Sequence, residues 1–212
     1  MAERRGVDTK VYQPAEDSGL LASAVVDRGR GRLLEVGTGS GWVAERAVRD
    51  AEGVTRVVAS DLSPHACHEA RLRSVAATGD GTNVPPAFDV VRADLVDPFA
   101  ADAFDTVAFN PPYLPTDPEN EWDDWMEQAL SGGETGRELV DPFIDSVGRV
   151  LAPGGVVLLL VSSLTGYEAV LDRAESRGFT HEVVVEESYP FETLSVVALT
   201  REGAERAANA DK

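Results

Sequence analysis

The residues of this sequence best suited to chemistry follow an apolar run near its middle. In "TVAFNPPYLPT", Asn110 offers a side-chain carbonyl, and Pro111, Pro112 and Tyr113 come directly after it. The two prolines remove two backbone N–H donors and fix two φ angles, which holds the Pro111 carbonyl in one direction. Two fixed acceptors can hold both hydrogens of a planar NH2 group, and Tyr113 can stack on its plane. The motif therefore predicts a site that orients an amino or amide nitrogen.

A glycine loop follows an earlier apolar run. In "LLEVGTGSGW", Gly37, Gly39 and Gly41 come after Glu35. Glycines at such a turn let the backbone approach a ligand and let the next helix pack close to the sheet. The spacing is G-x-G-x-G, whereas a dinucleotide site would have its third glycine where Trp42 stands. The spacing therefore does not match that of a dinucleotide site, and the loop alone is weak evidence for a ligand site.

Two further apolar runs end in carboxylates, Asp61 in "RVVASD" and Asp94 in "FDVVRAD". Ligands of open α/β sheets bind at the carboxyl edge of the strands. There, Asp61 could accept the hydroxyls of a ribose, and Asp94 the exocyclic amine of an adenine. Each acid alone could equally form a turn or cap a helix. Following the glycine loop in chain order, the two acids favour a nucleoside pocket.

The elements that must position these residues can be read from the apolar runs. Five runs, "RLLEVG", "RVVASD", "FDVVRAD", "TVAFN" and "VVLLLV", alternate with helical patterns, and "HEVVVEE" and "TLSVVALT" follow through "SYPFE". This pattern predicts an α/β fold with a mostly parallel seven-stranded sheet and a closing antiparallel hairpin. We expect one domain over residues 31–201, after a segment 1–30 and before a frayed or disordered tail 202–212.

Composition narrows the class of protein. The chain has 212 residues with 43% hydrophobic content and no apolar run approaching the roughly 18 to 20 residues of a membrane helix, so we expect a cytoplasmic protein. Cys67 is the only cysteine, which excludes an internal disulfide and a Cys-rich zinc site. His65 and His68 flank it on what should be a surface helix, and we assign no metal.

The charge balance is strongly acidic. The formal net charge is −18, and Lys10 and Lys212 are the only lysines. The carboxylates are spread along the chain, which predicts an acidic surface like that of proteins from salt-loving organisms. The alternative is an ordinary acidic mesophilic protein. Such a chain should repel phosphates, so direct binding of nucleic acid is not expected.

The order of the glycine loop, the two acids and "NPPY" resembles that of class I S-adenosylmethionine-dependent methyltransferases, which have a Rossmann-like fold. "NPPY" resembles the branch that methylates adenine or guanine amino groups and glutamine amides. "VYQPAEDSGLL", "SGGETGRELVD" and "ETLSVV" are similar to segments of the HemK-type enzymes, in particular the short archaeal and eukaryotic branch. Those enzymes methylate the glutamine of the GGQ loop in class-1 translation release factors. The resemblance extends from Val11 to Thr200.

The resemblance implies a role for each matching position, with S-adenosyl-L-methionine as the cofactor. The acceptor amide would be held by Asn110, Pro111, Pro112 and Tyr113. The implied cofactor contacts are Ser18 as a lid, where the family commonly has threonine, then Glu35, Gly37, Gly39, Gly41, Asp61, Leu62, Asp94, Leu95 and Asn110. The segment 1–30 would then cover the cofactor. Trp122 and Trp125 could cover the acceptor peptide or pack on the domain.

The resemblance also implies partners. A class-1 release factor would be the substrate, and a small zinc-containing activator protein would pair with the edge strand near Ala87 to Arg92 as a heterodimer. "AFDVV" is apolar and has no lysine, so the edge is poorly defended against β-augmentation. Alternatively, helices or the loop "GDGTNVPP" cover this edge and the chain works alone.

Two other functions stay open. One is methylation of a nucleic-acid base or a protein lysine in the same pocket. The other is a catalytically idle, methyltransferase-like binding subunit, against which the intact Asp61, Asp94 and Asn110 argue.

Overall fold

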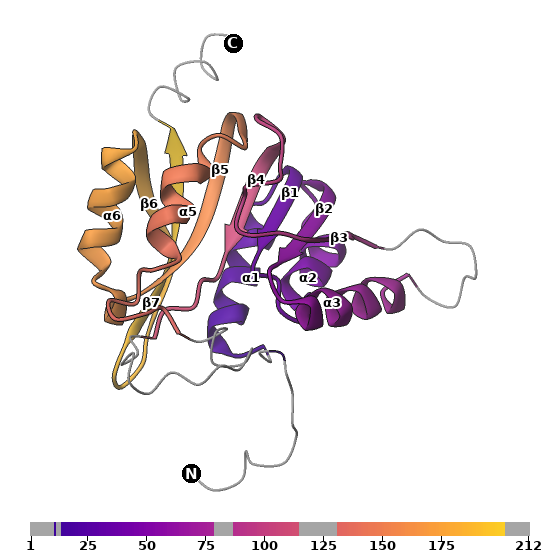
Figure 1. The fold of residues 1–212 in the computed structure, drawn as a ribbon, viewed down its shortest axis with the longest axis horizontal. Helices are drawn as coiled ribbons and strands as arrows, with labels where there is room; N and C mark the ends of the chain where they lie inside the picture. Colours follow the sequence, from indigo (N-terminus) through magenta and orange to yellow (C-terminus); the bar gives the residue numbers. More distant parts are fainter. Residues whose placement is uncertain (1–10, 12–13, 79–86, 115–130, 202–212) are drawn as a thin grey trace, which may run out of the picture.

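The seven apolar runs form one sheet. The computed structural model describes residues 11, 14–78, 87–114 and 131–201. Its strands lie in the order β3-β2-β1-β4-β5-β7-β6 (Figure 1). Their bounds are β1 (Gly31–Val36), β2 (Val54–Asp61), β3 (Asp89–Arg92), β4 (Phe104–Phe109), β5 (Leu151–Ser162), β6 (Phe179–Ser188) and β7 (Thr193–Arg201).

The pairing is parallel in one part of the sheet and antiparallel in the other. β1 pairs in parallel with β2 and β4, with Leu33 opposite Val57 and Thr106. β3 joins the outer side of β2, and β5 the outer side of β4, both in parallel. β7 is antiparallel to both of its neighbours, β5 and β6. The expected mostly parallel seven-stranded sheet with its closing hairpin is confirmed, and β3 lies at the edge.

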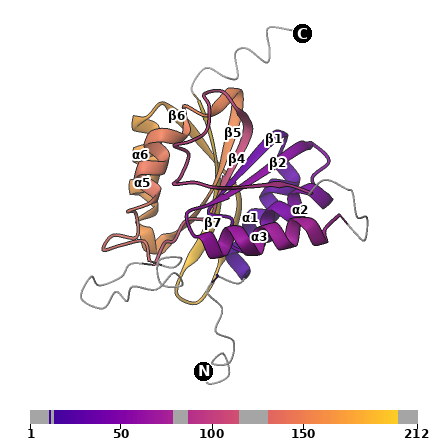
Figure 2. The same cartoon turned by 45° about the vertical axis from the view of Figure 1, so that its right-hand side comes forward.

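Helices cover both faces of the sheet. Figure 2 shows α1, α2 and α3 on one face and α5 and α6 on the other. The helices are α1 (Glu16–Arg28), α2 (Trp42–Asp50), α3 (Pro64–Ala76), α5 (Val140–Val147) and α6 (Tyr167–Ser176), with a short 3₁₀ helix η2 (Ser163–Thr165). Among the described residues, no helix has the length and apolar character needed to cross a membrane.

The core has two apolar layers, one on each side of the sheet. Leu33 lies in the layer under α1 and α2, whereas Leu34 lies in the layer that contains Phe143 of α5. Successive side chains of a strand point to opposite faces, so a sheet covered on both sides needs consecutive apolar residues. This requirement explains why the parallel strands appear in the sequence as unbroken apolar runs.

Helix α1 is part of the domain's core. Leu21 and Val25 have no solvent exposure and lie in the same apolar layer as Leu33 and Leu158. This anchoring fixes the first turn of α1 relative to the sheet. The boundary at residue 30 stays a prediction, and the predicted tail 202–212 lies outside the described residues.

Candidate active site

The residues that the sequence singled out lie along one edge of the sheet. β3, β2, β1 and β4 are adjacent and parallel, so their carboxyl ends meet at the same side. Asp94 follows β3, Asp61 ends β2, Gly37 follows β1, and Asn110 follows β4. The open side of an α/β sheet where ligands bind is therefore formed by these four positions.

The glycine loop takes a backbone conformation that other residues rarely adopt. Gly37, Gly39 and Gly41 have φ values of 63°, 55° and 78°. A Cβ atom added at Gly41 would lie 3.0 Å from the Cα atom of Ala70 in α3. Because glycine has no side chain, the backbone of the loop stays accessible and α2 can start close to α3.

Asp61 is fixed against this loop. Its Oδ2 accepts a hydrogen bond from the Gly39 N–H at 2.9 Å, and its Oδ1 accepts one from the Ser63 N–H at 2.8 Å. Burial raises the pKa of the Asp61 carboxyl, and the backbone donors of Gly39 and Ser63 partly oppose this effect. The carboxylate is held at the end of β2 by backbone groups, with a fixed orientation.

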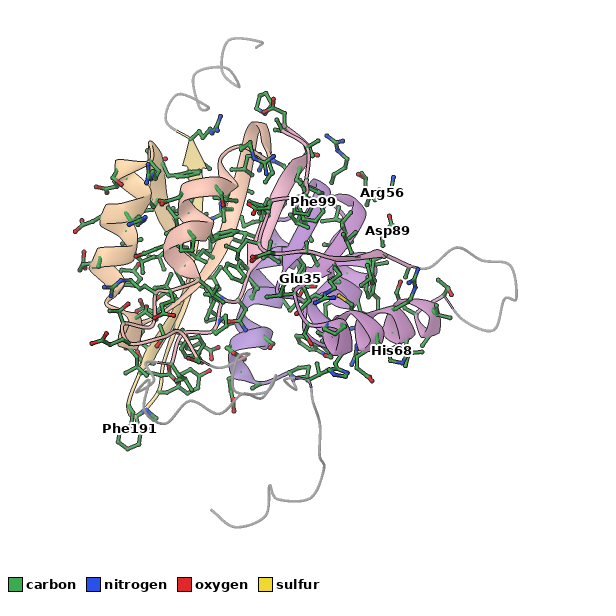
Figure 3. All side chains as sticks on the ribbon, in the orientation of Figure 1. Glu35, Arg56, His68, Asp89, Phe99 and Phe191 are labelled. Atoms are coloured by element: carbon green, nitrogen blue, oxygen red, sulfur yellow. The ribbon has the colours of Figure 1, made fainter. Side chains whose placement is uncertain are left out.

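Glu35 is a buried acid inside the site. Only 3% of the residue is exposed, and the Thr38 hydroxyl donates to Glu35 Oε2 at 2.6 Å. Figure 3 shows Glu35 in the interior of the molecule. Burial raises the pKa of Glu35 to about 8, although the Thr38 hydrogen bond lowers it. A buried acid beside a glycine loop is suited to a ligand that brings a positive charge.

The two candidates after β3 and the one after β2 are more open. Asp94 is exposed, Leu62 is 49% exposed, and Leu95 has a φ of 43°, in the left-handed region that leucine rarely adopts. Among the described residues, no hydrogen bond joins the Asp94 side chain to the rest of the predicted site. The structure brings these residues to the same edge, where the Arg92 side chain donates to the Leu62 carbonyl at 2.9 Å and Leu95 packs against the apolar core.

Residues 110–113, which we call the acceptor motif because they are predicted to hold the substrate amide, begin with an asparagine whose two polar atoms have different surroundings. The Asn110 Nδ2 atom donates to Asp17 Oδ2 at 3.0 Å, whereas Asn110 Oδ1 is buried and has no hydrogen-bond partner among the described residues. A buried polar atom without a partner is uncommon and marks a place where a ligand can bind. The next residue, Pro111, is buried as well.

Asp17 was not predicted from the sequence. It is 5% exposed and lies in the first turn of α1, next to the predicted lid residue Ser18, which is 7% exposed. The only sequence signal was its place in "VYQPAEDSGLL", where a carboxylate stands beside the predicted contact.

Tyr113 lies among acidic groups. Burial raises the pKa of the Tyr113 phenol well above its ordinary value, and the charges of Asp17, Glu192 and Glu16 raise it further. Glu192 is fixed at the β6–β7 turn, where its Oε2 accepts from the Ser162 hydroxyl at 2.8 Å. The phenol therefore stays neutral, which leaves the ring free to pack against an uncharged planar group.

The segment "SGGETGRELVD" begins directly beside the motif. The Gly132 N–H donates to the Leu114 carbonyl at 2.9 Å, and a Cβ atom added at Gly136 would lie 2.8 Å from the Tyr113 carbonyl oxygen. The segment "VYQPAEDSGLL" before the motif and the segment "SGGETGRELVD" after it therefore both contact the motif.

His65 and His68 lie on helix α3, on either side of Cys67. His68 is exposed on the outside of α3 (Figure 3), and within the described ranges no three acidic, histidine or cysteine side chains could hold a metal ion. Trp122 and Trp125 lie outside the described residues.

Comparisons with known proteins show the family to which the chain belongs. Residues 34–111, from β1 to the acceptor motif, match the family model described as a methyltransferase domain. A Methanocaldococcus jannaschii protein that carries the name protein N5-glutamine methyltransferase is 35% identical over 188 residues, which cover 89% of this chain and 90% of that protein. The chain belongs to the protein N5-glutamine methyltransferase family.

Other proteins are also similar over nearly the whole chain. Human methyltransferase HEMK2 is 30% identical, with 93% of this chain and 92% of that protein covered. A chain from the structure of the E. cuniculi Mtq2–Trm112 complex, described as responsible for methylation of the eRF1 translation termination factor, is 28% identical. The superposition has a TM-score of 0.69 and covers 92% of this chain and 100% of that chain.

As a methyltransferase of this family, the chain is an enzyme whose cofactor is S-adenosylmethionine. The residues present fit that molecule. The cofactor carries a sulfonium and an ammonium group, ribose hydroxyls and an adenine, and the site offers the carboxyl groups of Glu35 and Asp61 beside a bare glycine backbone.

Proposed function

We propose that this chain methylates the side-chain amide of a glutamine in a translation release factor. The observation that carries the proposal is the buried Asn110 Oδ1 atom, which has no partner among the described residues although Nδ2 of the same side chain is bound. An acceptor amide has two N–H hydrogens. Asn110 Oδ1 can accept one, and the Pro111 carbonyl, fixed between two pyrrolidine rings, can accept the other.

Orientation is the main contribution of these residues to the reaction. An amide nitrogen is a poor nucleophile because its lone pair is delocalised. The bound cofactor supplies an electrophilic methyl group on its sulfonium. Asn110 and Pro111 hold the nitrogen in line with that group, and Tyr113 packs on the amide plane. Orientation of this kind contributes up to about 7 to 11 kcal/mol to lowering a reaction barrier.

The roles proposed for the cofactor residues follow the edge of the sheet. Glu35 and Gly37 hold the methionine and ribose end, and Asp61 with Leu62 holds the ribose hydroxyls. Asp94 and Leu95 hold the adenine, and Ser18 closes the site from α1. Gly39 and Gly41 keep the loop free of side chains. Asp61 is the best supported of the carboxylates because two backbone N–H groups already orient it.

The names of relatives support a release factor as the acceptor. Proteins named release factor glutamine methyltransferase and eRF1 methyltransferase catalytic subunit are among the similar sequences. The first comes from Deinococcus radiodurans and the second from Schizosaccharomyces pombe. Translation takes place in the cytoplasm, so a cytoplasmic location accompanies this proposal.

The test is transfer of a labelled methyl group from S-adenosylmethionine to purified release factor. A release factor whose GGQ glutamine is replaced by asparagine is the matched control, and lysine-bearing peptides and nucleic acids are the competing acceptors. We expect label on the wild-type release factor alone. Transfer only to lysine or nucleic acid would overturn the proposal, and failure to bind the cofactor at all would point to an idle binding subunit.

We also propose a small zinc-containing activator protein as a partner at the edge strand β3. In the described part of the chain, β3 is paired only on its β2 side. A hollow of about 390 Å³ lies beside this edge. Its lining includes Val58, Val91, Phe99 and Phe104. Figure 3 shows Arg56, Asp89 and Phe99 on this side of the molecule. An unpaired strand beside apolar surface is suited to β-augmentation.

The structure of the E. cuniculi complex, in which a similar chain is found with Trm112, supports a partner of this kind. The zinc would belong to that partner, since this chain has only one cysteine. The loop "GDGTNVPP", which could instead cover the edge, lies outside the described residues.

A further inference from the structure

The Asp17 carboxylate joins two parts of the chain that lie 93 residues apart in sequence. Asp17 Oδ2 accepts from Asn110 Nδ2 at 3.0 Å. Asp17 Oδ1 accepts from the Ser18 N–H at 2.6 Å and lies 3.3 Å from the Ser18 hydroxyl. The residue is only 5% exposed. One carboxylate oxygen is therefore directed to the first turn of α1, and the other to the acceptor motif.

This arrangement decides which end of the Asn110 carboxamide faces the acceptor. A carboxamide has an acceptor oxygen and a donor NH2 group of nearly the same size, so its shape alone does not select one orientation. An ionised carboxylate can only accept hydrogen bonds. With Asp17 on one side, the NH2 group must turn toward it, and Oδ1 must turn to the other side, where it is buried without a partner among the described residues.

We infer that Asp17 is a positioning residue for methyl transfer, which holds the Asn110 carboxamide so that Oδ1 accepts from the substrate amide. The inference rests on the proposed function and adds a residue to it. Asp17 does not touch the reacting atoms and acts through Asn110. If the carboxamide were reversed, its NH2 group would meet the NH2 group of the substrate, donor against donor, and the amide would not be held.

The surroundings of Asp17 suit this role. Helix α1 is anchored in the core by Leu21 and Val25, which have no solvent exposure. The Ser18 N–H fixes the rotation of the carboxylate. A group held by packing and by hydrogen bonds can orient its neighbour without reorganisation during the reaction.

The experiment compares Asp17→Asn with Asp27→Asn in the full-length protein. Asp17→Asn keeps the size of the side chain but adds an NH2 donor, so the Asn110 carboxamide can adopt either orientation. Asp27→Asn makes the same chemical change at an exposed position of the same helix. We expect Asp17→Asn to lower kcat for release-factor methylation by about 100-fold, as for a misplaced reactant. The cofactor Kd and the urea midpoint of Asp17→Asn should stay near their wild-type values. Asp27→Asn should have the kcat, cofactor Kd and urea midpoint of the wild type.

A double variant separates positioning from a general structural role. In the Asn110→Ala background there is no carboxamide to orient, so Asp17→Asn should cause no further loss of kcat. An equal loss in both backgrounds, or a loss of cofactor binding and stability in proportion to kcat, would overturn the inference. A kcat of Asp17→Asn equal to that of Asp27→Asn would also overturn the inference. If the wild type methylates no release factor, the proposed function fails and this inference fails with it.

Discussion

At the scale of single residues, we propose that the site divides into groups that hold the cofactor and groups that hold the acceptor. Asp61 is fixed to the glycine loop through the Gly39 N–H, whereas Asn110 is fixed to α1 through Asp17. The two side chains are thus oriented by different neighbours. Their substitution should affect different steps of the reaction.

Replacing Asn110 by alanine should leave cofactor affinity within a few-fold of wild type and lower methyl transfer by about 100-fold or more, because the acceptor loses its orientation. Asp61→Ala should weaken cofactor binding first, since the ribose hydroxyls lose their acceptor. Calorimetry with S-adenosylmethionine and single-turnover methylation distinguish the two effects. Equal loss of cofactor binding in both variants would contradict the division of roles.

The buried acid Glu35 predicts a pH dependence of stability in the absence of cofactor. Its pKa is about 8 in the folded protein, against an ordinary value of 4.5. Because the folded pKa is raised, the stabilisation is complete below the unfolded pKa and is lost as pH rises through about 8. For one such group, the slope approaches about 1.4 kcal/mol per pH unit.

Urea unfolding of the wild type and of Glu35→Gln, measured from pH 5 to pH 9, tests this expectation. The glutamine cannot ionise and keeps an oxygen for the Thr38 hydroxyl. The difference in unfolding free energy between the two proteins should therefore move in favour of the glutamine variant as pH rises. A difference that stays constant over this range would show that Glu35 does not titrate there.

At the scale of secondary-structure elements, the start of α2 depends on a glycine. Gly41 precedes α2 with a φ of 78°, and a Cβ atom there would lie 3.0 Å from Ala70 Cα and 3.2 Å from Phe88 Cζ. Gly41→Ala should cost about 1 to 3 kcal/mol through backbone strain and crowding. Gly19→Ala is the matched control, because Gly19 lies inside α1 with nothing within 4 Å of the added atom.

Gly19→Ala should stabilise the protein by about 0.5 to 1 kcal/mol, as alanine does in a helix interior. Urea unfolding of both variants gives the comparison. If Gly19→Ala were destabilised and Gly41→Ala were unaffected, the requirement for glycine would lie at position 19 and not at position 41.

The edge strand β3 gives a sharp test of the proposed activator. The Ala93 N–H donates to the Asp61 carbonyl of β2. Backbone groups alternate along a strand, so the Val91 N–H also points toward β2 and the Val90 N–H points to the open edge. Val90→Pro should therefore remove a donor on the outer side of β3 without removing one of its bonds to β2.

Co-expression with the activator and size-exclusion chromatography provide the measurement. Val90→Ala loses similar packing but keeps the N–H, so it should retain the complex, while Val90→Pro should lose it. Equal complex formation by both variants would place the contact elsewhere. An isolated chain that is monodisperse, binds cofactor and methylates at full rate would show that no activator is needed.

At the scale of the whole molecule, the net charge of −18 predicts a salt requirement. The ion pairs of the described residues are exposed or half-buried, and exposed pairs contribute little to stability. Repulsion among the remaining carboxylates is screened when the Debye length falls to about 3 Å at 1 M salt. The protein should thus become more stable as salt rises.

The Debye length shortens as KCl rises from about 0.1 to 2 M. Over this range, thermal unfolding should show a melting temperature that rises by several degrees. A variant with Asp27→Asn, Glu52→Gln and Asp172→Asn should have a smaller rise, because these exposed carboxylates lie outside the ion pairs of the described residues. If the melting temperature did not depend on KCl, the alternative of an ordinary acidic mesophilic protein would be favoured over a protein adapted to high salt.

The sequence by itself determined the strands and the order in which the candidate site residues follow them. The apolar runs, the glycine loop, the acids at Asp61 and Asp94 and the Asn110 motif are local patterns, and a parallel α/β sheet brings successive strand ends to one edge. The hairpin and the edge position of β3 were also expected and are confirmed. These features could be predicted because each depends on neighbouring residues and on the usual topology of the fold.

Only the tertiary structure decided which groups meet and in what environment. The Asp17–Asn110 hydrogen bond joins residues 93 positions apart, and no local period in the sequence encodes such a pair. Likewise, the pKa of Glu35 is raised because α/β packing removes its carboxyl from water, which the residue's position on a strand does not reveal. Hydrogen-bond partners and burial depend on how separate elements pack, so the direction of the Asn110 carboxamide became visible only in the folded chain.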